Sequence, residues 1–213
     1  MKVRPGTLAI MLASEALAVA LAAMAFSEGR VYPGNSALLG GLLMLIPFML
    51  EMAGLVRLPM FMQGWAFLAV GLHILGLYLG MYDNAWWWDE VTHVISSSMV
   101  GMVAALGLFL FDLHSVKIKV PRWAYPLMVV TFSLFIGVVW EIAEFGGDLL
   151  AGTRMQYSLS DTLHDCYVDL LGGLITSVLW VTWLWKDPEE ELSKAAMPSL
   201  VRLFERTFAT PQG

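Results

Sequence analysis

The strongest constraint on this chain is a series of long apolar segments. A helix needs about 20 apolar residues to cross a bilayer core of about 30 Å. Six segments of this kind follow one another, bounded by charge, Pro or Gly, over residues 7–26, 36–54, 62–80, 90–111, 124–147 and 162–185. Because the connections are short, we predict an all-α fold in which six transmembrane helices form one bundle of antiparallel neighbours.

The composition excludes several other classes of protein. Of the 213 residues, 58% are hydrophobic and 14% are charged, whereas a water-soluble domain carries about 25% charged residues. Lys and Arg number 12 against 18 Asp and Glu, giving a net charge of −6. The chain therefore lacks the basic face that nucleic-acid binding needs. Its single cysteine, Cys166, excludes an internal disulfide framework and a Cys-rich zinc module.

The basic residues indicate how the helices are oriented, because all of them fall outside the six predicted spans. If the N-terminus is cytoplasmic, the inner segments hold Lys2, Arg4, Arg57, Lys117, Lys119, Arg122, Lys186, Lys194, Arg202 and Arg206. The outer loops hold only Arg30 and Arg154. The positive-inside rule therefore predicts a multi-pass protein of the inner (plasma) membrane with both termini cytoplasmic.

The two ends of the chain carry further signals. We divide the chain into a transmembrane domain, residues 1–186, and a cytoplasmic tail, residues 187–213. In the tail, Leu200, Leu203, Phe204 and Phe208 have helical spacing, which predicts a short amphipathic helix on the inner membrane surface. The first segment follows Lys2 and Arg4 and could be a signal peptide. We expect it to be retained as the first span.

Acids and histidines also occur inside the predicted spans, where a charged side chain costs about 2.5–3.5 kcal/mol. At the start of the last span they recur at i, i+4 and i+8, and therefore share one helix face. These residues are Asp161, Asp165 and Asp169. Two other helices carry comparable one-sided sets, which are Glu141, Glu144 and Asp148 in the fifth span and Asp89, His93 and Ser96 in the fourth.

The predicted topology brings these faces, together with His73 of the third span, to one acidic pocket near the outer end. No Lys or Arg lies within a span to neutralise the pocket, so it needs protons, a histidinium or a bound cation. We favour a divalent metal ion, with Zn, Mn and Fe as candidates. The predicted metal ligands are His73, His93, Glu141, Asp161, Asp165 and Asp169. Glu144 and Asp89 are the predicted catalytic residues, as general base or as groups that orient the ligands.

Structural roles remain open for several of these residues. Asp89 and Asp161 stand at helix starts, where an aspartate commonly serves as an N-cap. Asp148 could be an interfacial residue, and His164 is expected to face a loop. Glu15 and Glu51 do not join the pocket easily, and the sequence leaves them as protonated packing residues or as part of a proton path.

The chain resembles the YjdF-type family of bacterial inner-membrane proteins and, more distantly, the VanZ-like proteins. The resemblance covers about residues 57–173. It consists of His73 in Gly-Leu-His, the Asp89-x-x-x-His93 pair, Trp140-Glu141-x-x-Glu144, and the segment from Ser160 to Gly172 that carries the aspartate stripe. The chain departs from the family at Glu90 and at residues 155–159. The resemblance implies a polytopic membrane fold, and its VanZ-like part implies envelope chemistry, but it supplies no activity to transfer.

Three functional hypotheses follow. The first is an integral membrane metalloprotein, a hydrolase or oxidase, that acts on a lipid or lipid-linked envelope substrate. The second is a proton- or cation-coupled transporter, although no repeated half is visible in the sequence. The third is a non-catalytic accessory subunit of a membrane complex. The expected partners are the lipid bilayer, a lipid-linked substrate, and either a second copy of the chain or a membrane-complex partner, with no nucleic acid.

Overall fold

The computed structural model describes residues 2–115, 119–153, 155–184, 195 and 198–208. Every regular element in that part of the chain is helical, which confirms the all-α prediction. The helices are α1 (Pro5–Ser27), α2 (Val31–Met52), α3 (Met60–Leu79), α4 (Met81–Asn84), α5 (Trp88–His114), α6 (Ala124–Ala151), α7 (Leu159–Leu184) and α9 (Pro198–Phe208).

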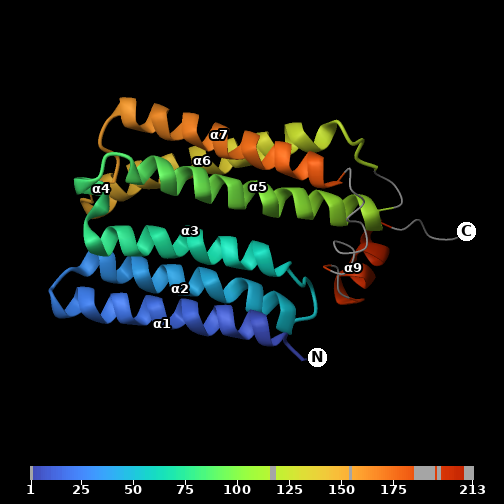
Figure 1. The fold of residues 1–213 in the computed structure, drawn as a ribbon, viewed down its shortest axis with the longest axis horizontal. Helices are drawn as coiled ribbons and strands as arrows, with labels where there is room; N and C mark the ends of the chain where they lie inside the picture. Colours follow the sequence, from blue (N-terminus) through green and yellow to red (C-terminus); the bar gives the residue numbers. More distant parts are fainter. Residues whose placement is uncertain (1, 116–118, 154, 185–194, 196–197, 209–213) are drawn as a thin grey trace, which may run out of the picture.

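The six long helices lie side by side in two groups of three (Figure 1). Helices α1, α2 and α3 pack against one another, as do α5, α6 and α7, and the two groups meet mainly where α3 packs against α5. The N-terminus and α9 lie at one end of the molecule, which we call the terminal end. The short helix α4 lies at the opposite end, which we call the α4 end.

Five of the long helices are long and apolar enough to cross a membrane, namely α1, α2, α3, α5 and residues 124–150 of α6. These five correspond to predicted spans. The sixth, α7, carries the aspartate stripe and packs along both α5 and α6. Helix α2 begins at Val31 rather than at residue 36. Pro33 does not prevent this earlier start, because it lies in the first turn, where proline is tolerated.

Small residues bring α5, α6 and α7 close together. Gly173 of α7 contacts Ser133 of α6, and the Ser133 hydroxyl donates to the Ser97 carbonyl of α5 at 3.1 Å. Gly172, which follows the aspartate stripe on α7, faces Ser97 and allows the two helices to approach closely. This tight packing holds the polar faces of the three helices against one another.

Glu51 is ion-paired at the terminal end. Its carboxylate, 2% exposed, accepts hydrogen bonds from Arg4 at 2.9 Å and from the Thr7 hydroxyl at 2.7 Å. Arg57 lies 3.4 Å away. The sequence placed both arginines outside the spans and left Glu51 as a packing residue or part of a proton path. The structure instead gives it two cationic partners, because both arginines reach into the end of the bundle.

The tail helix α9 is found where the amphipathic spacing predicted it, and it packs against α5. Just before it, the Ala195 carbonyl accepts a hydrogen bond from the Arg57 backbone at 2.8 Å. Other features used in the sequence argument lie outside the described residues. They are Lys117, Arg154, Lys186 and Lys194.

Candidate metal centre

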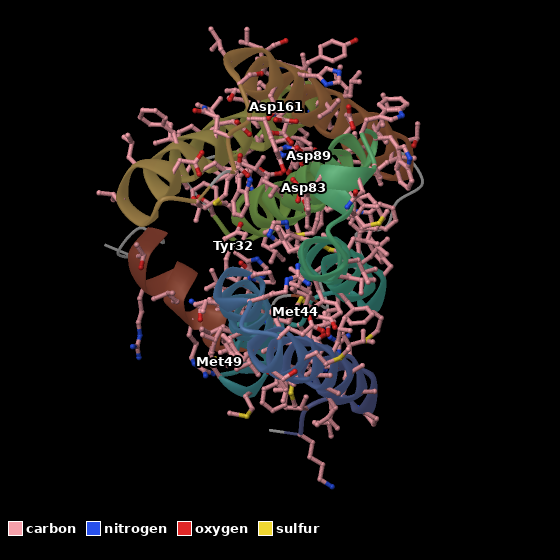
Figure 2. The ribbon with its side chains drawn as sticks, turned by 90° about the vertical axis from the view of Figure 1, so that its left-hand side faces the viewer. Tyr32, Met44, Met49, Asp83, Asp89 and Asp161 are labelled. Atoms are coloured by element: carbon pink, nitrogen blue, oxygen red, sulfur yellow. The ribbon has the colours of Figure 1, made fainter. Side chains whose placement is uncertain are left out.

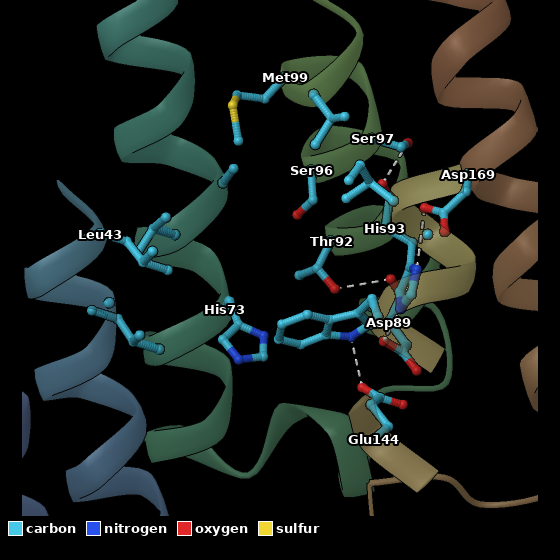
Figure 3. A pocket seen from close by; sticks show the side chains of 18 of the residues that line it. Leu43, His73, Asp89, Thr92, His93, Ser96, Ser97, Met99, Glu144 and Asp169 are labelled. Atoms are coloured by element: carbon cyan, nitrogen blue, oxygen red, sulfur yellow. Dashed lines mark hydrogen bonds and ion pairs between the residues drawn. The ribbon is translucent and has the colours of Figure 1, made fainter. Parts of the chain in front are cut away.

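His93 lies at the centre of the polar cluster at the α4 end (Figure 3). Its Nδ1 is 3.3 Å from Oδ1 of Asp169 on α7, and its Nε2 is 3.5 Å from Oδ1 of Asp89 on its own helix. His93 is 8% exposed and Asp169 3%. The ring is thus held between two carboxylates that come from different helices, in a largely buried environment.

The side chains of Asp89, His93 and Asp165 are close enough together to hold a metal ion. One ligand atom each from Asp89, His93 and Asp165 lies within 4.8 Å of the others. Carboxylate oxygens and imidazole nitrogens bind Zn²⁺ at about 2.0–2.2 Å, so the set would tighten by about 1 Å around an ion. Asp165 is 3% exposed, and its position one turn before Asp169 follows from the i, i+4 spacing.

The buried carboxylate of Glu141 is a second indication that the cluster lacks a cationic partner. The residue is 4% exposed, and neither of its carboxylate oxygens makes a well-formed hydrogen bond with a described residue. The Thr162 hydroxyl, His93 and Asp169 are in its neighbourhood. Oδ2 of Asp169 is also buried without a hydrogen-bond partner among the described residues. Burying carboxylates in this state is costly, and a bound cation would relieve that cost.

Two of the predicted acidic residues organise the loop between α6 and α7. Asp148 accepts hydrogen bonds from the Thr153 hydroxyl at 2.6 Å and from the backbone N–H groups of Met155 and Gln156 at 2.8 and 3.0 Å. Asp161 accepts from the Tyr157 N–H at 3.4 Å, and its own N–H donates to Ser158. The structural roles left open for both residues therefore have specific partners.

The start of α5 is different, because Asp89 makes no capping hydrogen bond there. The helix begins at Trp88, and its N-cap residue, Trp87, also has no side-chain cap. The Asp89 carboxylate is turned toward His93 instead. His164, as expected, points outward, with a side chain 56% exposed and 3.5 Å from Glu90.

His73 and Glu144 stand beside the three-residue group rather than in it. His73 Nδ1 is 2.8 Å from the Tyr82 hydroxyl, and its ring packs edge-on against Trp140 with centroids 5.6 Å apart. The Trp140 indole N–H donates to Glu144 at 2.8 Å. Burial raises the pKa of Tyr82, which keeps its phenol neutral and able to donate. His73, Tyr82, Trp140 and Glu144 thus form a wall beside the cluster.

The cluster and this wall open into a cavity of about 470 Å³ between the two helix groups. The cavity is lined by His73 from α3, by Asp89 and His93 from α5, by Glu144 from α6 and by Asp169 from α7. Its volume falls in the range of about 300–1,000 Å³ that is typical of ligand pockets. No Lys or Arg is found among its lining residues in the described part of the chain, and Arg154 lies outside that part.

Sequence reasoning missed some contributors to this site. Gly137 is one turn before Glu141, and a Cβ atom there would collide with the Asp169 carboxylate. Its i, i+4 spacing from Glu141 was the available signal. No sequence signal pointed to Tyr82 or Tyr32. Tyr82 lies in α4, a four-residue helix within a predicted loop, and Tyr32 precedes the predicted second span. Figure 2, a view onto the α4 end, shows Tyr32 across from Asp89 and Asp161.

A family model described as a predicted membrane protein, DUF2238, matches residues 9–186. The chain belongs to the DUF2238 family. Membership of the DUF2238 family agrees with the apolar helices but indicates no chemical activity. An uncharacterised protein of Thermotoga maritima is 33% identical over 110 residues, which are 49% of this chain and 53% of that protein. The chain thus spans about half the length of this curated relative. No solved structure matches the chain.

Proposed function

We propose that this DUF2238 protein binds a divalent metal ion within the membrane and uses it in a hydrolytic reaction. The arrangement that carries the proposal is His93 held between Asp169 and Asp89, with Asp165 completing a set within 4.8 Å. A His ligand whose other ring nitrogen is fixed by a carboxylate is the usual arrangement of metal sites in proteins. The buried carboxylate of Glu141, which makes no well-formed hydrogen bond with a described residue, supports the same conclusion.

The roles of the remaining site residues follow from their contacts. Asp89, His93 and Asp165 would hold the ion, with Glu141 as a further ligand and Asp169 orienting His93. His73 and Asp161, which were also predicted as ligands, would lie farther from the ion. His73 already contacts the Tyr82 hydroxyl, and Asp161 accepts a hydrogen bond from the Tyr157 N–H. Zn, Mn and Fe remain the candidate ions.

A bound divalent ion would lower the pKa of a coordinated water and supply a nucleophile near neutral pH. Asp89 is among the three candidate ligands, so Glu144 is the candidate general base. It lines the cavity and is fixed by the Trp140 indole. Its side chain can therefore hold a proton taken from a reacting group in the cavity.

We further propose that α7 is a sixth span, that residues 1–186 form the transmembrane domain, and that both termini are cytoplasmic. Residues 187–213 then form the tail, with α9 on the inner surface. The distribution of basic residues supports this orientation. The α4 end would then face outward from the inner membrane, where a lipid or lipid-linked envelope precursor can reach it. The YjdF-type and VanZ-like resemblance favours such a substrate only as an analogy.

The two other hypotheses fit the contacts less well. A transporter needs a second acidic site reachable from the terminal end, and its main candidate, Glu51, is paired with Arg4 and Arg57. An accessory subunit with a purely structural cluster predicts a satisfied polar core and no cavity. The cavity of about 470 Å³ and the lack of a well-formed hydrogen bond to the buried Glu141 carboxylate in the described residues argue against that.

The deciding experiment is elemental analysis of the full chain, purified without a polyhistidine tag. We expect about one Zn, Mn or Fe per chain, which His93→Ala and Asp165→Asn should abolish. Glu90→Gln is the matched control, because Glu90 adjoins Asp89 but is not part of the three-residue group, and its carboxylate lies 3.5 Å from His164. This control should keep its metal.

The same samples are compared by circular dichroism and by elution from a sizing column, so that a lost metal is separated from a lost fold. Folded wild-type protein that remains free of metal after incubation with each ion would overturn the proposal. Equal loss of metal in Glu90→Gln and Asp165→Asn would overturn the assignment of the ligands.

A further inference from the structure

The cavity opens sideways between α2 and α6. Four of its lining residues on these two helices are substantially exposed, namely Leu39 at 58%, Leu43 at 49%, Ile136 at 37% and Trp140 at 41%. Both helices are candidate membrane spans. Although both line the cavity, their described residues form no extensive packing interface with each other. An opening at this position faces lipid rather than water.

The opposite side of the cavity is closed. There α3 packs against α5, and the Trp65 indole N–H of α3 donates to the Ser98 hydroxyl of α5 at 2.8 Å. The lining residues on this side are buried, with Ala69 at 3%, Ile74 at 2% and Thr92 at 4% exposure. In the part of the chain that the structure describes, the α2–α6 opening is therefore the route by which a ligand that resides in the bilayer can reach the cavity.

The cavity is amphipathic along its length. From Tyr32 to Leu43 its α2 wall covers 12 residues, with about 17 Å of helix between the first and the last at 1.5 Å per residue. Toward Leu43 the lining is mostly apolar and includes Val70, Met99 and Val100. The hydroxyls of Ser97 and Ser133, which also line this part, donate to backbone carbonyls. Toward the α4 end it carries the carboxylates. This polarity fits one alkyl chain with a polar headgroup at the α4 end (Figure 3).

The headgroup region favours positive charge. Asp89, Glu144 and Asp169 all line it, and no described lining residue is Lys or Arg. With Asp165 and Glu141 close behind, the carboxylates outnumber the two positive charges of one divalent ion. An anionic headgroup would meet this excess of negative charge, whereas an ammonium group would reduce it.

Aromatic rings stand where such a headgroup would lie. His73 is edge-on to both Tyr82 and Trp140, with centroids 5.7 and 5.6 Å away and interplanar angles of 70° and 85°. Tyr32 lines the same region. Nearly perpendicular rings next to a carboxylate form the walls of the sites that bind ammonium and quaternary ammonium groups.

We propose that the cavity binds a single-chain amphiphile with a cationic amine or quaternary ammonium headgroup, which enters from the bilayer between α2 and α6. This names the substrate class of the proposed site and rests on the proposed function only in placing that site within the membrane. The ammonium group lies among Trp140, Tyr82 and Glu144, and the alkyl chain lies along Leu43 and Ile136. The ion and the headgroup occupy adjacent parts of one cavity.

The test uses three photoreactive alkyl chains of equal length, ending in trimethylammonium, phosphate or hydroxyl, added to the full chain in lipid nanodiscs. Labelled peptides are quantified by mass spectrometry. The trimethylammonium probe should label residues 31–52 and 124–151 at least about 5-fold more than the other two. Unlabelled hexadecyltrimethylammonium should compete with it, and Glu144→Gln should remove most of the preference.

Matched tryptophan substitutions test the route. Leu43→Trp and Ile136→Trp fill the cavity and should abolish labelling. Their controls are Leu42→Trp, at a position 63% exposed, and Val139→Trp, at a position 44% exposed, and neither position lines the cavity. These controls should label as the wild type does. Folding of every variant is checked by thermal melting, and two filling variants on different helices guard against one that fails to fold.

Three outcomes would overturn the inference. Equal labelling by all probes, unaffected by Leu43→Trp, would mean annular lipid only. Preference for the phosphate probe, lost in Asp165→Asn, would mean an anionic substrate held through the ion. Normal metal content with no labelling of residues 31–52 or 124–151 would leave the metal proposal intact and remove this one.

Discussion

The imidazole Nδ1 of His93 lies 3.3 Å from Oδ1 of Asp169, and this contact joins α5 to α7 in the buried interior. A histidine that binds a metal usually donates its other ring N–H to a carboxylate, which fixes both the tautomer and the ring plane. With the proton on Nδ1, Nε2 directs its lone pair toward the side of Asp89, 3.5 Å away. The pairing therefore prepares His93 to act as a ligand.

Asp169→Asn should weaken metal binding without abolishing it. Asparagine keeps the size of the side chain but removes the charge that orients His93, and such changes cost about 10–100-fold in metal affinity. Titration of metal-stripped protein against a chelating indicator measures this. Full stoichiometry should return at saturating metal, in contrast to Asp165→Asn. An unchanged affinity would mean that Asp169 does not position the ring.

Gly137→Ala should produce a similar loss from a position that bears no ligand. A Cβ atom at residue 137 would collide with the Asp169 carboxylate, so the carboxylate must move away from His93. Gly146→Ala is the matched control on the same helix, because a Cβ atom there meets nothing within 4 Å. We expect lower metal affinity in Gly137→Ala only. Equal affinities in the two variants would contradict the geometry around Asp169.

Arg4→Ala should destabilise the protein and leave the metal site intact. Removing one partner of a buried ion pair costs about 3–5 kcal/mol, and we expect about 3 kcal/mol because Arg57 still lies near Glu51. Thermal unfolding in detergent measures the change. Glu28→Gln is the control, since its pair with Arg30 is 3.5 Å long and its side chain is 46% exposed. That variant should lose about 0–1 kcal/mol. Equal losses would contradict the buried pair at Glu51.

The parts of the fold that could be predicted from sequence are those that depend on local periodicity. Long apolar runs predicted the helices, and the i, i+4 spacing placed Asp165 and Asp169 on one face. The predicted antiparallel topology brought this face to His93 of another helix, and Figure 3 shows Asp169 beside His93. These relationships follow from helix geometry and from antiparallel connections.

The remaining parts depend on long-range contacts that no local pattern reveals. Arg4 and Arg57 reach Glu51 from segments that looked like solvent-exposed flanks. The predicted ligand Asp161 has the carboxylate spacing of its neighbours, yet it accepts the Tyr157 N–H at the helix start. Tyr82 joins the site because α4 folds back toward His73. Such placements arise from tertiary packing rather than from residue type.

The proposed topology predicts which face of the membrane each end occupies. In a Cys166→Ser background, Asn84→Cys on α4 should react with a membrane-impermeant maleimide added to intact spheroplasts, because Asn84 is exposed at the α4 end. Arg202→Cys on α9 should react only after permeabilisation. Mass shift on a gel measures both. Reaction of residue 202 in intact spheroplasts would overturn the assignment of a cytoplasmic C-terminus.

Tyr157 should titrate late because its contact with Asp83 joins the α6–α7 loop to α4. The phenol donates to Oδ1 of Asp83 at 3.0 Å, and burial together with this contact raises the pKa of Tyr157 to about 12. An unfolded tyrosine titrates at about 10. The stabilisation is therefore complete below about pH 10 and is lost as the pH rises toward 12. Absorbance at the phenolate band, taken as wild type minus Tyr157→Phe, isolates this residue, and Asp83→Asn should move its midpoint down. A wild-type midpoint already near 10 would mean that the two segments are not joined.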